Sequence, residues 1–143
     1  FIDDPTNNDD KFLRSRVRKL LINLDKEGLK FNKFYLTLKN LSKSDQVIEF
    51  YVDKNILENS KYFEKDKKII LNQSFFNNPE EIILRSIMQV IKRISRKKNY
   101  PRGKKVNSLI DSIKFSNKNV KLTLSGCIIE KIQDSVIIYP EKR

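Results

Sequence analysis

Apolar residues recur at helical spacing over much of the N-terminal half of the chain. Between residues 10 and 24, and again between 29 and 62, they return every three or four positions, which places them on one face of an α-helix. The second stretch predicts either one long helix or two helices joined near residues 42–44. Gly28 lies between the two stretches and either ends the first helix or starts the next.

A third helix is predicted from the sequence Asn78-Pro79-Glu80-Glu81, which supplies a cap, a proline for the first turn and two acids. It runs into the basic residues 96–98, and a linker at 99–103 leads to a short helix at about 104–113. Upstream, residues 67–71 predict a short strand or an extended link. The apolar seam of the third helix consists of Ile83, Ile87, Val90 and Ile94, widened by Leu84, Met88 and Ile91.

Near the C-terminus the period changes from helical to two. Alternating apolar residues at 120–124, 127–129 and 136–138 are separated by turns at 125–126 and 133–134, which predicts a small antiparallel meander. Cys127 lies among these apolar residues and is interpreted as a small core residue. The expected fold class is mainly α (α+β): a helical domain with a small C-terminal antiparallel β-hairpin or meander.

Composition removes several kinds of chemistry. The chain of 143 residues has no histidine and one cysteine, so it offers no histidine base, no internal disulfide and no cysteine cluster for a metal; no metal ligand is proposed. It contains neither of the glycine-rich phosphate-loop motifs GxxxxGK[ST] and GxGxxG. No apolar run approaches a membrane span, and a reducing, cytoplasmic location is expected. Oligomeric state is left open.

The chain is strongly basic, with a net charge of +12. Such an excess attracts polyanions, and nucleic acid is the expected partner. Abundant lysine, asparagine and isoleucine also fit a proteome with AT-rich codons, in which case part of the charge is background. A purely structural helical domain therefore stays open as an interpretation.

The densest basic segment is 92–105, in which eight of fourteen residues are Lys or Arg and none is acidic. Mobile cations bind phosphates and an aromatic ring can stack on a base, so this segment is predicted to contact nucleic acid. The alternative is a solvated helix end that complements its own dipole. The candidate residues are Lys92, Arg93, Arg96, Lys97, Lys98, Tyr100, Arg102, Lys104 and Lys105.

A second group of polar residues lies at the N-terminus. Residues 1–8 predict a strand end and a turn, in which Asp4 and Asn7 either build the turn or line a cleft. The following helix carries Arg14, Arg16 and Arg18, whose guanidinium groups suit phosphate. Pairing of these arginines with the upstream acids at 3–4 and 9–10 is the alternative.

The segment FIDDPTNNDDKFLRSRVRKLL resembles the end of the catalytic domain of tRNA(Ile)-lysidine synthase, a PP-loop ATPase family. In that family an [E/D]-D-P-[ST]-N turn, an acidic spacer and an aromatic precede an arginine-rich helix. Ser15 departs from the asparagine that many members carry there. The matching residues are Asp4, Pro5, Thr6, Asn7, Asp10, Phe12, Arg14 and Arg18.

The C-terminal 45 or so residues resemble the end of the same family's helical domain, where P-R-x-x-K begins a helix that leads into a T-L-x-G-C hairpin. Between the two segments only helical character is matched. The residues that carry this second match are Pro101, Arg102, Leu109, Thr123, Leu124, Gly126 and Cys127.

The resemblance implies an ATP-dependent C–N ligase that uses ATP, Mg²⁺ and free lysine to attach lysine to C2 of the wobble cytidine of tRNA(Ile) with a CAU anticodon. It implies that residues 1–25 end the PP-loop catalytic domain and residues 26–143 form a helical tRNA-binding domain with a β-meander. Arg14 and Arg18, with Asp4 and Asn7, are then expected to face a substrate, and Arg16 to contact tRNA.

The family's ATP loop, SGGxDS, is absent from this sequence, and the chain opens on Phe1 without a methionine. We therefore expect a C-terminal fragment that binds tRNA, holds no cofactor itself and is inactive alone. The alternative is a free-standing basic RNA- or DNA-binding adaptor without enzymatic activity.

Overall fold

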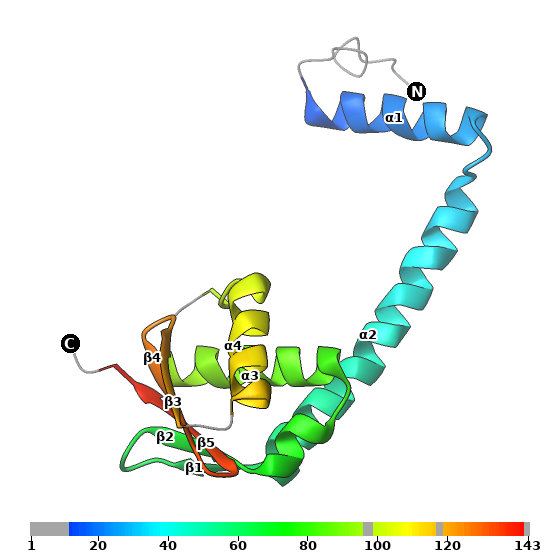
Figure 1. Cartoon of the computed structure of the whole chain (residues 1–143). Coiled ribbons are helices and arrows are strands. Elements are labelled where there is room, and N and C mark those ends of the chain that lie inside the picture. The colour runs from blue at the N-terminus through cyan, green and yellow to red at the C-terminus, as the bar shows by residue number, and fades with distance from the viewer. Residues whose placement is uncertain (1–11, 96–98, 117–118, 142–143) are drawn as a thin grey trace. The chain divides into compact units, whose positions relative to one another are not determined.

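The computed structural model describes residues 12–95, 99–116 and 119–141. The chain divides into two compact units, Phe1–Asp45 and Gln46–Arg143, which are described separately. Its helices and strands are labelled in Figure 1. The boundary lies inside a long helix, and the assignment of residues 1–25 and 26–143 to a catalytic and a tRNA-binding domain stays a prediction.

The first unit contains helix α1, Leu13–Lys26, and the start of helix α2, Phe31–Asn59. The helix begins at Leu13 and not near residue 10 as predicted, with Phe12 at the cap position and no side-chain cap. Gly28 ends it with a φ of 90°, and the N–H of Leu29 donates to the Leu24 carbonyl at 2.9 Å, as in a Schellman motif. Of the alternatives for Gly28, the helix end is therefore confirmed.

Helix α2, Phe31–Asn59, is a single helix, which decides between the two alternatives for this stretch. It ends three residues earlier than predicted. Residues beyond it form strand β1, Ser60–Phe63, which pairs with β2, Lys68–Leu71. The prediction of helix through residue 62 was wrong because backbone pairing with a strand further along the chain overrides local spacing. The strand alternative for 67–71 is confirmed.

The predicted meander is the C-terminal part of a larger sheet. Strands β3 (Val120–Leu124), β4 (Cys127–Ile132) and β5 (Ser135–Pro140) follow one another as expected. Strand β2 adds to β5, with Ile69 opposite Ile138, so that five antiparallel strands run in the order β1-β2-β5-β4-β3. Ser125 and Gly126, with φ of 54° and 81°, form the tight turn between β3 and β4.

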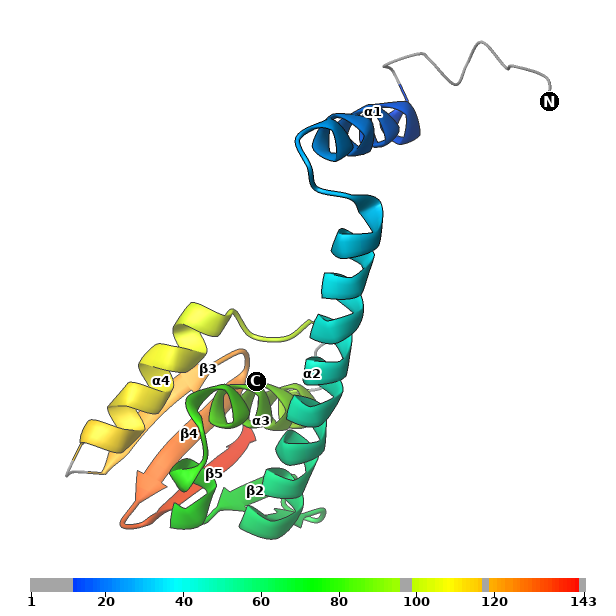
Figure 2. The same ribbon diagram turned by 90° about the vertical axis from the view of Figure 1, so that its right-hand side faces the viewer.

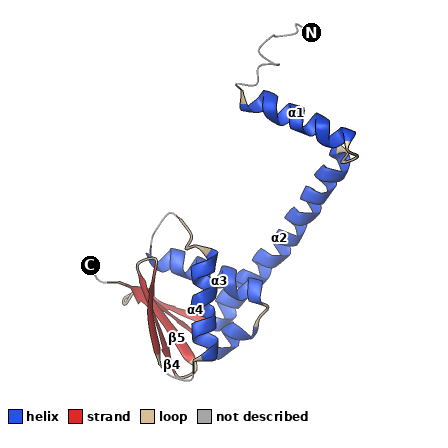
Figure 3. Ribbon diagram, turned by 45° about the horizontal axis from the view of Figure 1, so that its top comes forward, coloured by secondary structure: helices blue, strands red, loops and turns tan. Residues whose placement is uncertain are grey.

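Helices α3, Glu80–Ser95, and α4, Gly103–Phe115, cover one face of the sheet (Figures 2 and 3). A short 3₁₀ helix at Gln73–Asn77, which the sequence pattern did not predict, precedes α3. Cys127 is fully buried in the core, as predicted. The other core side chains include Ile69, Leu71, Phe75, Ile83, Ile87, Val90, Ile91, Ile94, Val106, Leu109, Ile113, Ile129, Val136 and Ile138.

A buried asparagine fastens the C-terminal part of α2 to this core. The Asn55 amide donates to the carbonyl of Phe75 at 3.3 Å and to the Ser86 hydroxyl at 3.2 Å. Its side-chain oxygen accepts from the amides of Asn59 and Asn78, each at 2.9 Å. With its polar atoms bonded, Asn55 sets the position of α2 against the start of α3.

Candidate nucleic-acid interface

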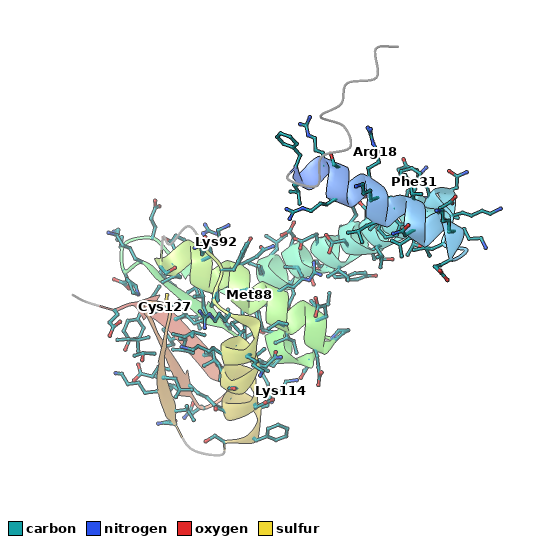
Figure 4. The ribbon with its side chains drawn as sticks, turned by 90° about the horizontal axis from the view of Figure 1, so that it is seen from above. Arg18, Phe31, Met88, Lys92, Lys114 and Cys127 are labelled. Carbon is teal, nitrogen blue, oxygen red and sulfur yellow. The ribbon has the colours of Figure 1, made fainter. Side chains whose placement is uncertain are left out.

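The described part of the basic segment gathers where α3 ends and α4 begins. Lys92 and Arg93 occupy the last turn of α3, and Tyr100 and Arg102 belong to the connection. Figure 4 shows Lys92 at this end of the domain and Lys114 at the opposite end of α4. The fold therefore brings together, at one site, cations from two helices and the loop between them.

Two tyrosine rings pair with cations of this cluster. The Lys92 ammonium lies 4.0 Å from the centre of the Tyr100 ring, and the Arg93 guanidinium carbon lies 4.5 Å from that of Tyr62. Such cation–π contacts hold the long side chains while leaving their N–H groups available. Tyr100 is 50% exposed and Tyr62 37% exposed, so both rings still have accessible surface.

Tyr62 is the residue of this site that sequence reasoning missed. Helical spacing assigned it to the end of α2, whereas it lies on strand β1 and its ring meets the far end of α3. A signal was available, since the run Lys61-Tyr62-Phe63 follows a polar break at Asn59-Ser60 and has the aromatic content that strands favour.

The charge at this site is not neutralised by neighbouring acids. Within the described ranges, no ion pair joins an acidic side chain to the five cations of the cluster, whereas pairs do occur elsewhere, such as Lys54–Glu58 at 3.9 Å. The cations are Lys92, Arg93, Arg102, Lys104 and Lys105.

The helix dipoles distinguish the two halves of the cluster. Lys92 and Arg93 lie at the C-terminal end of α3, where the dipole favours cations. Lys104 and Lys105 lie in the first turn of α4, which holds no acid, at the end where the dipole disfavours cations. Dipole complementation therefore accounts for the α3 half of the cluster and not for the α4 half.

A cleft of about 210 Å³ adjoins Tyr100. It is lined by Glu49 from α2 and by Arg85, Met88 and Gln89 from α3. Both carboxylate oxygens of Glu49 are engaged, since they accept from Arg85 at 3.2 Å and from Gln89 at 3.1 Å. The acid that lines this cleft together with the exposed tyrosine is thus paired inside the domain.

The remaining predicted site residues are not brought to this cluster. Arg96, Lys97 and Lys98, like Asp4 and Asn7, lie outside the described residues. Arg14, Arg16 and Arg18 are exposed on α1, in the other compact unit. Arg14 and Arg18 are one helical turn apart and share a face, as the spacing predicted. Their roles stay predictions.

No group of three or more His, Cys, Asp or Glu side chains that could hold a metal ion occurs among the described residues. None of the helices that the structure describes is both long and apolar enough to cross a membrane.

No protein-family model matches the sequence, and no curated protein is similar to it.

Proposed function

We propose that this chain is part of a tRNA(Ile)-lysidine synthase and that its role there is to bind tRNA. The proposal rests on two sequence segments that resemble that family and on the basic cluster between α3 and α4. In the parent enzyme, ATP with Mg²⁺ activates C2 of the wobble cytidine, and the amine of free lysine replaces the adenylate. No bond-forming step is assigned to the chain itself.

The observation that carries tRNA binding is the placement of Lys104 and Lys105. They stand at the positive end of α4 without an acidic partner among the described residues, which is unfavourable for the isolated domain. A phosphate removes that disadvantage. Arg102 occupies the N-cap position and makes no side-chain cap hydrogen bond, while its carbonyl accepts from the N–H groups of Lys105 and Val106; the two N–H groups before these, of Gly103 and Lys104, are the ones that can face an anion.

The two tyrosines give this cluster a second mode of contact. Lys92 lies over the ring of Tyr100, and Arg93 lies over that of Tyr62. When either cation binds a phosphate, its tyrosine ring lies beside the sugar and base of the same nucleotide. Stacking of this kind is insensitive to sequence, and phosphate contacts fix register without reading bases. Recognition of one tRNA therefore depends on shape and on the parent enzyme's catalytic domain.

We predict that replacing Lys104 and Lys105 by glutamine weakens tRNA binding chiefly at low salt. Each lost phosphate contact reduces the steepness of the plot of log K against log salt by about 1. The slope of the double variant should therefore be less steep by about 2. The measurement is filter binding of tRNA over a series of salt concentrations.

The matched control removes the same charge elsewhere on the domain. Lys65 and Lys114 are exposed, and changing both to glutamine should leave the slope within about 0.5 of the unaltered chain. Equal slopes for the two double variants would show that net charge, and not this cluster, attracts RNA. Failure of the unaltered chain to bind any tRNA at low salt would favour the purely structural interpretation.

The family assignment has a separate test. The reading frame upstream of Phe1 should encode an SGGxDS loop within a couple of hundred residues, and a frame without one contradicts the assignment. A start codon close to Phe1, preceded by a stop, would instead favour a free-standing RNA- or DNA-binding adaptor. The salt-dependence experiment with the glutamine variants does not depend on this outcome.

A further inference from the structure

One face of the five-stranded sheet is left open by α3 and α4. Side chains alternate along each strand, so the buried Ile69 and Leu71 of β2 point to the helices while Lys68 and Ile70 point the other way. Figure 3 shows both helices on the same side of the strands. We call the opposite side the open face. Its members are Lys61, Phe63, Lys68, Ile70, Lys121, Thr123, Ile128, Glu130, Ile132, Ser135, Ile137 and Tyr139.

Two aromatic rings lie in one row across this face. Phe63 is opposite Lys68, and Tyr139 is opposite Ile128. Because Ile69 pairs with Ile138, the next positions, 68 and 139, are also neighbours. Phe63 and Tyr139 are therefore separated by a single strand, a Cα spacing of about 10 Å.

Lysines accompany both rings. The ammonium groups of Lys61 and Lys68 lie 5.5 Å and 5.4 Å from the centre of the Phe63 ring, and Lys68 also bonds Asp66 of the adjoining turn at 2.7 Å. At the other end of the face, the Lys121 ammonium lies 3.2 Å from Glu130.

The open face has one carboxylate, and it is occupied. Glu130 accepts from the Tyr139 hydroxyl at 3.1 Å through one oxygen and pairs with Lys121 through the other. Three lysines against one glutamate leave the open face at a net +2, and counting Asp66 of the turn leaves +1. In the adjacent row, the half-buried Ile70 and Ile137 supply an apolar floor beside the rings.

We propose that the open face is a stacking platform for unpaired nucleotides, with Phe63 and Tyr139 as the base-stacking residues and Lys61, Lys68 and Lys121 as phosphate contacts. Aromatic rings interleaved with cations on an uncovered sheet suit single-stranded nucleic acid, since every base presents a π-face. A protein partner fits this face less well, because cations flank both rings. The platform is distinct from the α3–α4 cluster and does not rest on the proposed family.

The test uses binding of a short labelled single-stranded RNA, about eight nucleotides long, followed by fluorescence anisotropy. Changing Phe63 to leucine keeps apolar volume and removes the ring, and should weaken binding about tenfold; Tyr139→Leu should do the same. Tyr139→Phe keeps the ring and should retain most of the affinity. The matched control is Phe115→Leu, since Phe115 is an 81% exposed aromatic on α4 and should not affect binding.

A direct reporter is available because the chain has no tryptophan. In the variant Phe63→Trp, stacking of a base should quench the single indole as RNA is added, with the same midpoint as the anisotropy change. Circular dichroism checks that each variant folds.

The proposal is overturned if both leucine variants keep the RNA affinity of the unaltered chain, or if the indole emission of Phe63→Trp does not change as RNA is added. Concentration-dependent dimerisation that Phe63→Leu abolishes, without RNA binding, would also overturn it and make the face a self-association surface. The glutamine variant at Lys104 and Lys105 serves as the separate measure of the α3–α4 cluster. If the glutamine variant loses tRNA binding while both leucine variants keep their RNA affinity, the platform proposal fails and the cluster proposal stands. If the leucine variants lose RNA affinity while the glutamine variant keeps its tRNA binding, the reverse holds.

Discussion

At the scale of single residues, Lys121 shows how neighbours on a sheet set a proton equilibrium. A hydrogen bond with Tyr139, followed by the hydrogen bond and charge of Glu130, raises the pKa of Lys121 above its ordinary value of 10.5. A group whose pKa is raised on folding stabilises the folded state, and this contribution is fully present at pH values below the pKa that the group has in the unfolded chain. That contribution is lost as the pH rises through the folded pKa. Lys121 is therefore charged wherever RNA would be bound.

We predict that Tyr139→Phe moves the pKa of Lys121 back toward 10.5, because it removes the first of these causes. The measurement is an NMR titration of the lysine side chain through the alkaline range. Glu130→Gln should act in the same direction. A titration that neither substitution changes would contradict the assigned causes.

At the scale of elements, the turn between β3 and β4 requires a left-handed backbone at two successive residues. Ser125 tolerates it with a φ of 54°, and Gly126 adopts 81° without a Cβ to clash. This turn sets the register in which Leu124 faces Cys127, and hence which residues of β4 enter the core.

Substituting Gly126 by alanine should therefore lower the free energy of unfolding by about 1 kcal/mol, the cost of a left-handed conformation for a residue with a Cβ. The measurement is urea unfolding followed by circular dichroism. Gly103→Ala is the control, since Gly103 starts α4 with no positive φ and nothing within 4 Å of an added Cβ. It should be neutral or slightly stabilising, and an equal loss in both variants would contradict the turn argument.

At the scale of the whole molecule, the two compact units differ in how much they bury. Among residues 12–45 of the described chain, Ser15 is the only one that is buried, and four apolar side chains, Leu13, Leu20, Phe31 and Leu41, are 60% exposed or more. The second unit holds the packed core of α3, α4 and the sheet. Local stability follows buried apolar contact, so it should differ between the units.

We predict that backbone amides of α1 and the first half of α2 exchange with solvent much faster than those of α3 and β4. Hydrogen exchange read by mass spectrometry measures this directly. Equal protection in the two units of the isolated chain would mean that the apolar side chains of the first unit are covered in solution, and would contradict the prediction.

Local pattern predicted the elements whose cause is local. The apolar seam from Ile83 to Ile94 predicted α3. Alternating apolar residues predicted β3, β4 and β5, with Cys127 in the core. Strand β1 was missed because four residues carry little periodic signal and their partner, β2, is what makes them extended. Of the candidate site, the cations of residues 92–105 were predicted, but their meeting with Tyr62 was not, since that contact joins residues 31 positions apart.

The amino-acid order alone established the basic character of the chain, the helical spacing, the strand alternation and the types of side chain available for chemistry. Each of these depends on residues close together along the chain. Tertiary structure was needed to join β2 to β5, to bring Arg93 onto the ring of Tyr62, and to place Phe63 and Tyr139 on one open face. Those arrangements follow from strand pairing and core burial between distant segments, which no local pattern encodes.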